Sequence, residues 1–216
     1  MGVKAEVKNR CVIIAGGDFD AAERSVITPD DYVIAADSGY AVCIEYDIMP
    51  DLIVGDFDSF KGSLPDGIET IHLPTHKDDT DLLFAARCAA DKGYRSVAIL
   101  GGYGSRPDQN FAMYETLLWL RENVPGSDAC AFCRGFYVTV LLNDSKRIFV
   151  GSNRYLSVFS LYEKATGVDI TGAGYPLKNG VITAGFPIGV SNCADGYADI
   201  SVKNGALLIM VVDEFI

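Results

Sequence analysis

The chain has 216 residues and a formal net charge of −11 at pH 7. Its 49% share of hydrophobic residues supports a packed core and argues against a disordered acidic protein. The negative charge excludes broad contact with a nucleic-acid backbone, which requires clustered Lys and Arg. It leaves room for a divalent cation that holds phosphate, so the placement of the acidic residues matters.

The N-terminal ten residues contain three basic residues but no uninterrupted apolar core, so we expect no secretory signal. The longest apolar runs, 11–17 and 207–212, are far shorter than the roughly 20 residues of a membrane span. We therefore expect no membrane partner and a cytoplasmic protein with six reduced cysteines. Cys130 and Cys133 form a single C-x-x-C motif, with no second Cys pair and no histidine near it in the sequence. We therefore interpret them as a pair of half-buried thiols and not as a zinc site.

Short apolar runs alternate with amphipathic stretches in the first part of the chain. The pattern predicts strands at 11–15, 32–36, 52–54, 70–73 and 96–100, and helices at 39–46, 81–92 and 108–122. Strands that alternate with helices favour right-handed crossovers. We therefore predict an α/β domain over residues 1–130, with a mostly parallel sheet flanked by helices.

The pattern changes after Pro125-Gly126. Strands are predicted at 136–142, 147–150, 154–160, 180–183 and 206–212, and no helical period remains. Asn179-Gly180 and Asn204-Gly205 are dipeptides that tight hairpins prefer, because both central positions need positive φ. Residues 131–216 are therefore predicted to form an all-β, sandwich or barrel-like domain.

Acidic residues gather where the predicted elements meet. Asp37 follows the strand 32–36, Asp56 and Asp58 follow the strand 52–54, and three acids lie at 78, 79 and 81, where a helix begins. The carboxyl ends of parallel strands share one edge of a sheet, so we expect these side chains to converge there. Mg²⁺ takes one or two carboxylates plus phosphate oxygens, and this edge suits it.

Each acidic motif also has a purely structural interpretation. Asp56 and Asp58 are compatible with a turn that Gly55 permits, and a lone Asp37 is typical of a turn as well. Asp78, Thr80 and Asp81 can form the N-terminal cap of a helix. A cap explains one or two acids, but hardly three acids among four residues unless a cation balances them.

A glycine-rich segment, Gly101-Gly102-x-Gly104, lies between a predicted strand and a predicted helix. Such a loop can present backbone N–H groups to an anion, although it is neither G-x-G-x-x-G nor a Walker A loop. Arg106 beside it can bind phosphate oxygens, or else pair with Asp108. Lys77 is either a second phosphate contact or a solvated lysine. The acidic residues, the glycine-rich loop and the basic residues, gathered at one edge of the sheet, together suit phosphoryl transfer.

Four motifs occur in order along the chain, and Gly167-Val168 and Gly174-Tyr175-Pro176-Leu177 precede the last of them. The four motifs are G-D-F-D-S at 55–59, K-D-x-T-D at 77–81, G-G-x-G-x-R-x-D-Q at 101–109 and G-V-S-N at 189–192. This ordered set resembles the thiamine pyrophosphokinase family, and the resemblance spans roughly residues 11 to 212.

The resemblance implies an enzyme that transfers the terminal diphosphate of ATP to the hydroxyethyl oxygen of thiamine, releasing AMP. It also implies an α/β domain, a β domain, and a homodimer with thiamine at the subunit interface. By motif, Mg²⁺ would be bound by Asp56, Asp58 and Asp81, which with Arg106 and Asp108 form the catalytic set. The ATP side would comprise Asp37, Lys77, Asp78, Thr80, Gly102, Gly104, Arg106 and Gln109, and thiamine would contact Ser191 and Asn192. Gln109 stands where many bacterial members carry His, and Asp81 and Asp108 are candidate proton acceptors only by location.

Other functions remain compatible with parts of the pattern. The motifs of the first domain concern ATP, so a diphosphokinase for another hydroxylated heterocycle, such as a hydroxymethylpterin, is the main alternative. The run L-I-V-G-D-F-D at 52–58 is similar to the nucleophile strand of haloacid-dehalogenase-like phosphatases, which would form a phospho-aspartate and do not need the glycine-rich loop. A non-catalytic ligand-binding module would bind thiamine without producing AMP.

Overall fold

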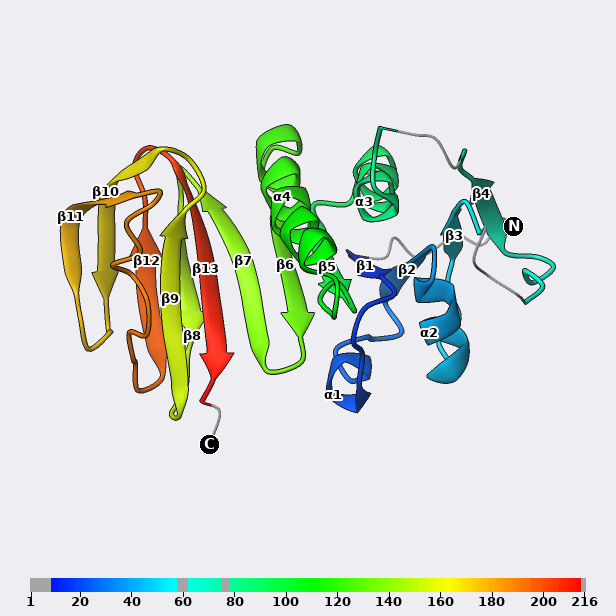
Figure 1. Ribbon diagram of the computed structural model, residues 1–216, viewed down its shortest axis with the longest axis horizontal. Coiled ribbons are helices and arrows are strands. Elements are labelled where there is room, and N and C mark those ends of the chain that lie inside the picture. Colours follow the sequence, from blue (N-terminus) through cyan, green and yellow to red (C-terminus); the bar gives the residue numbers. More distant parts are fainter. Residues whose placement is uncertain (1–8, 58–61, 75–77, 215–216) are drawn as a thin grey trace, which may run out of the picture. The chain divides into compact units, whose positions relative to one another are not determined.

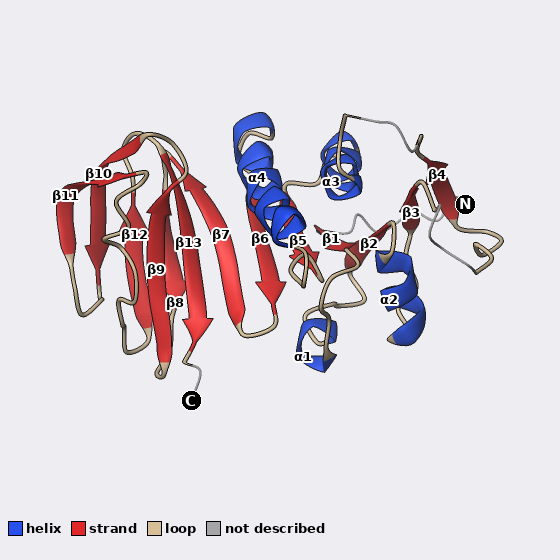
Figure 2. Cartoon of the chain, in the orientation of Figure 1, coloured by secondary structure: helices blue, strands red, loops and turns tan. Residues whose placement is uncertain are grey.

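The computed structural model describes residues 9–57, 62–74 and 78–214 (Figures 1 and 2). The chain divides into two compact units. The first contains Met1–Thr116 and Asn123–Arg134, and the second contains Leu117–Glu122 and Gly135–Ile216. None of the helices in the described ranges is both long enough and apolar enough to cross a membrane.

Parallel strands form the sheet of the first unit. They are β1 (Arg10–Ile14), β2 (Asp31–Ala36), β3 (Leu52–Gly55), β4 (Glu69–His72), β5 (Ser96–Leu100) and β6 (Asp128–Cys133). Their order is β4-β3-β2-β1-β5-β6, and every neighbouring pair runs parallel. The central strands are continuous apolar runs because helices cover the sheet on both faces.

The covering helices are short on one face and longer on the other. Figure 1 shows α1 (Ala21–Arg24) and α2 (Gly39–Glu45) on one side of the sheet, and α3 (Asp81–Asp91) on the opposite side. On the α2 side, Val12, Ile14 and Ile53 of the strands pack with Tyr40 and Cys43 of the helix. A further helix, α4 (Pro107–Asn123), follows β5 and ends before Pro125-Gly126, as predicted.

The strand order reverses between β1 and β5. From β1 to β4 the chain proceeds toward one edge of the sheet, whereas β5 and β6 continue from β1 toward the opposite edge. In open parallel sheets, ligands bind outside the carboxyl ends of the strands at this kind of switch point. The loops that follow β1, β2 and β5 therefore leave the sheet where a binding site is expected.

The second unit is antiparallel. Its strands are β7 (Phe136–Leu142), β8 (Ser145–Phe149), β9 (Arg154–Ser160), β10 (Lys164–Thr171), β11 (Leu177–Thr183), β12 (Tyr197–Ser201) and β13 (Ala206–Asp213). One set has the order β7-β13-β9 and the other β11-β10-β12-β8. Buried residues of both sets share one core, which includes Leu156, Ile209, Ile170 and Ile200. The predicted α/β domain with a parallel sheet, followed by an all-β sandwich, is confirmed.

Both predicted hairpin turns are wrong. Asn179 and Gly180 lie inside β11, where Asn179 has a φ of 46° opposite an irregular register of β10. Positive φ at this dipeptide therefore creates a bulge instead of a turn. Gly205 has a φ of 117° but connects β12 to β13, which are not paired with each other.

Elements with weak sequence periodicity went unpredicted. These are α1, β6, β10 and β12. β6 alternates in burial and adds a parallel strand to the first unit, although it follows the point where the sequence pattern changes. β10 contains Gly167, whose φ of 64° and register shifts interrupt the alternation that a regular strand would show.

Candidate active site

A pocket of about 340 Å³ lies at the carboxyl ends of β1, β2 and β5. Its wall consists of residues 15–17, 36–38, 80–82, 101–106 and 109–110. We call this site the rim pocket. The segments that line it come from the switch point and from the first turns of α3 and α4. The glycine-rich loop, Asp37 and the start of α3 therefore converge, as their positions at element ends predict.

The loop after β1 was not singled out from the sequence, yet it forms one wall of the rim pocket. The N–H of Gly17 donates to the carbonyl of Gly101 at 2.7 Å, and that of Asp18 donates to the carbonyl of Tyr103 at 2.7 Å. A Cβ atom at Gly17 would lie 2.4 Å from the Tyr103 oxygen. Only glycine lets these two loops approach so closely. The sequence feature that could have indicated this loop is the dipeptide Gly16-Gly17, which follows the first strand.

Two side chains outside the motifs hold the glycine-rich loop at its ends. The buried carboxylate of Glu23 accepts the N–H of Gly101 at 3.0 Å. At the other end, Asn110 accepts the N–H of Gly104 and donates to its carbonyl, both at 2.8 Å. Neither residue was predicted: Glu23 binds backbone 78 positions away and leaves no local pattern, whereas Asn110 lies just beyond the motif, in the first part of α4.

The acidic residues divide into those that line the rim pocket and those that do not. Asp37, with a φ of 47°, and Asp81, the first residue of α3, both belong to its wall. Asp56 follows Gly55, whose Cβ would lie 2.9 Å from the Asp37 Cα, but Asp56 is not part of the wall. Asp58 lies outside the described residues.

The start of α3 combines a helix cap with the pocket wall. Thr80 is the N-cap, and its Oγ1 accepts the N–H of Leu83 at 3.1 Å. Asp79 pairs with Arg87 at 2.5 Å, whereas Asp78 is exposed and does not line the pocket. The capping interpretation thus holds for Thr80, while Asp81 faces the pocket from the same turn. The predicted phosphate contact at position 77 lies outside the described residues.

Arg106 lines the rim pocket and pairs with Asp108. Its Nη2 lies 2.5 Å from Oδ2 of Asp108, and both side chains are well exposed, at 67% and 63%. The hydrogen bond from Arg106 lowers the pKa of the Asp108 carboxyl, and the same contact raises the pKa of Arg106. Asp108 itself is not part of the wall, whereas Gly102, Gly104 and Gln109 are.

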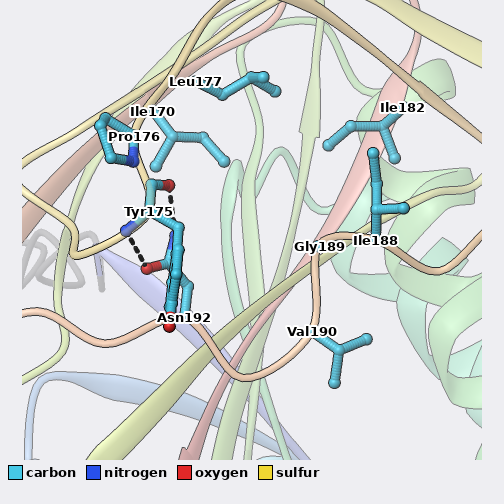
Figure 3. Close-up of a pocket in the computed structure, with 9 residues that line it drawn as sticks. All are labelled: Ile170, Tyr175, Pro176, Leu177, Ile182, Ile188, Gly189, Val190 and Asn192. Atoms are coloured by element: carbon cyan, nitrogen blue, oxygen red, sulfur yellow. Dashed lines mark hydrogen bonds between the residues drawn. The ribbon is translucent and has the colours of Figure 1, made fainter.

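The second unit contains a pocket of its own, of about 320 Å³ (Figure 3). We call it the apolar pocket, because its side chains are mainly aliphatic. It is lined by Ile170, Tyr175, Pro176, Leu177, Ile182, Ile188, Gly189, Val190 and Asn192. Tyr175, which was not among the predicted thiamine contacts, is 74% exposed and supplies an aromatic ring.

Asn192, which was predicted to contact a ligand, lines the apolar pocket, and its amide also binds backbone. Its Oδ1 accepts the N–H of Tyr175 at 2.9 Å and its Nδ2 donates to the Tyr175 carbonyl at 2.8 Å (Figure 3). The same Oδ1 also accepts the N–H of Cys193 at 2.9 Å. Ser191 has a φ of 58°, and its N–H donates to the hydroxyl of Ser157. Ser191 is not part of the wall of the apolar pocket.

Comparison with known proteins places both units in one family. The family model of the thiamin pyrophosphokinase catalytic domain matches residues 23–125, and that of the thiamin pyrophosphokinase vitamin B1 binding domain matches residues 144–207. The rim pocket lies within or close to the first range, and the apolar pocket lies within the second. No match was found among curated protein sequences.

Solved structures share the fold over the whole length. Thiamine pyrophosphokinase from Bacillus subtilis is 22% identical, with a TM-score of 0.83 over 95% of this chain and 100% of that one. The protein from Geobacillus thermodenitrificans is 24% identical, with a TM-score of 0.80 over 94% and 97%. The yeast enzyme is 15% identical, with a TM-score of 0.75 over 97% and 88%. Because the two family models together match residues 23–125 and 144–207, the chain belongs to the thiamin pyrophosphokinase family, the enzymes that transfer a diphosphate group from ATP to thiamine.

Proposed function

We propose that the rim pocket binds the polyphosphate of ATP. The terminal diphosphate of ATP is then transferred to the hydroxyethyl oxygen of thiamine, and AMP is released. The observation that carries this proposal is the convergence of Asp37, Asp81, Arg106 and the glycine-rich loop on one wall. Phosphoryl transfer is mainly positioning and charge neutralisation, and this wall offers both a cationic group and a backbone suited to anions.

The donor set of the rim pocket fits Mg²⁺. Asp37 and Asp81 both line it, and Mg²⁺ requires only one or two carboxylates besides substrate phosphate oxygens. Among the described residues no group of three or more His, Cys, Asp or Glu side chains is close enough to hold a metal without substrate. We propose Asp81 and Asp56, together with Asp58 as the G-D-F-D-S motif implies, as the ligands. When bound, Mg²⁺ offsets charge on the transferred diphosphate.

Arg106 is proposed to bind phosphate oxygens at the mouth of the rim pocket. Its pairing with Asp108 keeps the guanidinium beside the glycine-rich loop, with both groups exposed to solvent. The lowered pKa of Asp108 makes this carboxylate a weaker base than an unpaired one. Of the two acids that the sequence offers as proton acceptors, Asp81 lines the pocket and Asp108 does not.

The apolar pocket is proposed to receive the thiamine rings. Its aliphatic wall and the exposed ring of Tyr175 suit a flat heterocycle, and it lies within the range matched by the vitamin B1 binding domain. The amide of Asn192 is engaged with the backbone of Tyr175, which supports a role in holding that ring. Ser191 is proposed to contact thiamine from the adjacent position.

A homodimer and a cytoplasmic location complete the proposal. Large apolar side chains are exposed on the second unit, among them Tyr175, Phe186 and Ile188 at 74%, 63% and 57%. An interface between two copies would cover such side chains. All six cysteines lie in the described part of the chain and are free thiols, which is compatible with a reducing compartment.

An assay coupled to AMP formation, run over a panel of hydroxylated heterocycles with Mg-ATP, tests the function. We expect AMP release with thiamine and much slower release with a hydroxymethylpterin or with water as the acceptor. A pterin that outperforms thiamine would reassign the acceptor while leaving the transferred group unchanged. Thiamine binding without AMP formation would instead support a binding module and contradict the proposal.

A further inference from the structure

A buried carboxylate lies behind the rim pocket. Glu23, on the short helix α1, is only 3% exposed, and its two oxygens accept hydrogen bonds from two backbone segments. One oxygen accepts the N–H of Asp20 at 3.2 Å and completes the capping box of α1, while the other accepts the N–H of Gly101 at 3.0 Å. The first contact explains its place in the helix. The second reaches across 78 residues of sequence and needs a separate explanation.

Gly101 is the residue at which the glycine-rich loop leaves β5. Its φ of 62° is left-handed, and a Cβ atom there would lie 2.5 Å from the carbonyl oxygen of Ala15. Its carbonyl accepts the N–H of Gly17 while its N–H donates to Glu23, so both of its polar backbone groups are bound. A left-handed glycine bound on both sides fixes the direction in which the following residues leave the strand.

We propose that Glu23 is a positioning residue for the nucleotide site, because it holds Gly101 and thereby sets the course of residues 102–106 along the rim pocket. This inference rests on the proposed function, since it assumes that the loop binds the polyphosphate. Glu23 does not line the pocket and acts only through the loop backbone. Buried polar groups of this kind fix the geometry of a site by hydrogen bonding to the residues that line it.

The charge state of Glu23 depends on its surroundings. Burial is the main cause that raises its pKa, to about 7 from an ordinary value of 4.5, and the negative charges of Asp18 and Asp20 raise it further. The N–H groups of Gly101 and Asp20 act in the opposite direction. Cys133 of β6 faces the same carboxylate, and burial raises the pKa of this thiol well above its ordinary value, so it stays neutral near pH 7.

Ionisation of Glu23 has opposite effects on the loop and on the fold. An ionised carboxylate is the stronger acceptor, so the Gly101 contact is firmest above pH 7. A carboxyl group with a raised pKa gives stability that is fully present below the unfolded value of 4.5 and is lost as pH rises through about 7. Loop ordering therefore increases through the pH window in which the fold loses stability.

Titration calorimetry of Mg-ATP binding to the wild type and to Glu23→Gln, from about pH 5 to about pH 9, tests the proposal. Gln has the same size and one acceptor oxygen, but it does not ionise. We expect the Kd of the variant to exceed that of the wild type about tenfold at high pH, with the two converging at low pH. Protonation of ATP itself cancels in the ratio of the two constants.

Asp20→Asn is the matched control, because it removes a neighbouring carboxylate that does not touch the loop. Its Oδ1 still caps α1, so we expect nucleotide affinity at high pH within about twofold of the wild type. The midpoint of the pH dependence should fall, since the charge of Asp20 raises the pKa of Glu23.

The amide proton resonance of Gly101 gives a second readout that does not depend on nucleotide. In the wild type it should titrate with a midpoint near 7, and in Glu23→Gln it should not titrate. A Glu23→Gln variant whose Kd for Mg-ATP equals that of the wild type at high pH, with an unchanged Gly101 amide resonance, would overturn the positioning role. A wild type that fails to bind Mg-ATP at every pH would overturn the proposed function instead, and the Gly101 resonance alone would then decide the role of Glu23.

Discussion

Asp81 occupies a position where two physical requirements coincide. As the first residue of α3 it complements the positive end of the helix dipole, and it also lines the rim pocket. Asp79, two residues earlier, is instead neutralised by Arg87. Asp79 and Asp81 are close in sequence but have different surroundings. Matched substitutions at these two positions therefore test the metal assignment.

We expect Asp81→Asn to lower kcat about a hundredfold or more while the protein stays folded, because a carboxylate ligand of the Mg²⁺ that neutralises the phosphates is lost. Asp56→Asn should have an effect of the same order if Asp56 is also a ligand. Steady-state kinetics with thiamine and Mg-ATP measure both, and circular dichroism checks the fold.

Asp79→Asn is the control for this comparison, since its carboxylate is paired with Arg87 and does not line the pocket. It should keep most of the wild-type turnover. Near-normal kcat in both Asp81→Asn and Asp56→Asn would remove the basis for the metal assignment.

Glu23 and Asn110 show why part of the site escapes sequence analysis at the level of single residues. Both bind the glycine-rich loop through backbone groups, Glu23 from a distance of 78 positions along the chain. Asp37 and Arg106 were predictable, because a strand end and a glycine-rich loop are local signals. A side chain whose partner is a distant backbone group leaves no such signal.

At the level of the elements, the backbone of the segment between β10 and β11 is held by the side-chain amide of one residue, Asn192. Asn192 binds both the N–H and the carbonyl of Tyr175, and it also pairs with Leu156 of β9 through its own backbone. The sequence marked this residue as a ligand contact because it lies in the G-V-S-N motif. Its side chain lines the apolar pocket and also holds the backbone of Tyr175, a contact that only the folded arrangement of the strands reveals.

Asn192→Ala should raise the KM for thiamine about tenfold and leave the KM for Mg-ATP unchanged, because Tyr175 loses both of its anchoring hydrogen bonds. Asn192→Asp keeps the acceptor oxygen but not the donor, so its effect should be intermediate. Initial-rate kinetics in which each substrate is varied in turn measure both constants. An unchanged KM for thiamine in the alanine variant would contradict the anchoring role.

Across the whole molecule, the fold class and the edge of the sheet that carries the site were predictable from the sequence. The full set of strands was not. Alternating strands and helices imposed the parallel sheet, and the end of the last helix before Pro125-Gly126 was foreseen. β10 was missed because Gly167 interrupts its alternation, and Asn179-Gly180 was misread because positive φ serves bulges as well as turns.

The central claim is that the terminal diphosphate of ATP is transferred as one unit to thiamine. Phosphorus NMR of a single reaction of the protein with thiamine and Mg-ATP tests it most directly, because it identifies every phosphorylated product. We expect AMP and thiamine diphosphate in equal amounts, without ADP or inorganic phosphate. ADP paired with a monophosphorylated acceptor, or phosphate released without thiamine, would contradict it.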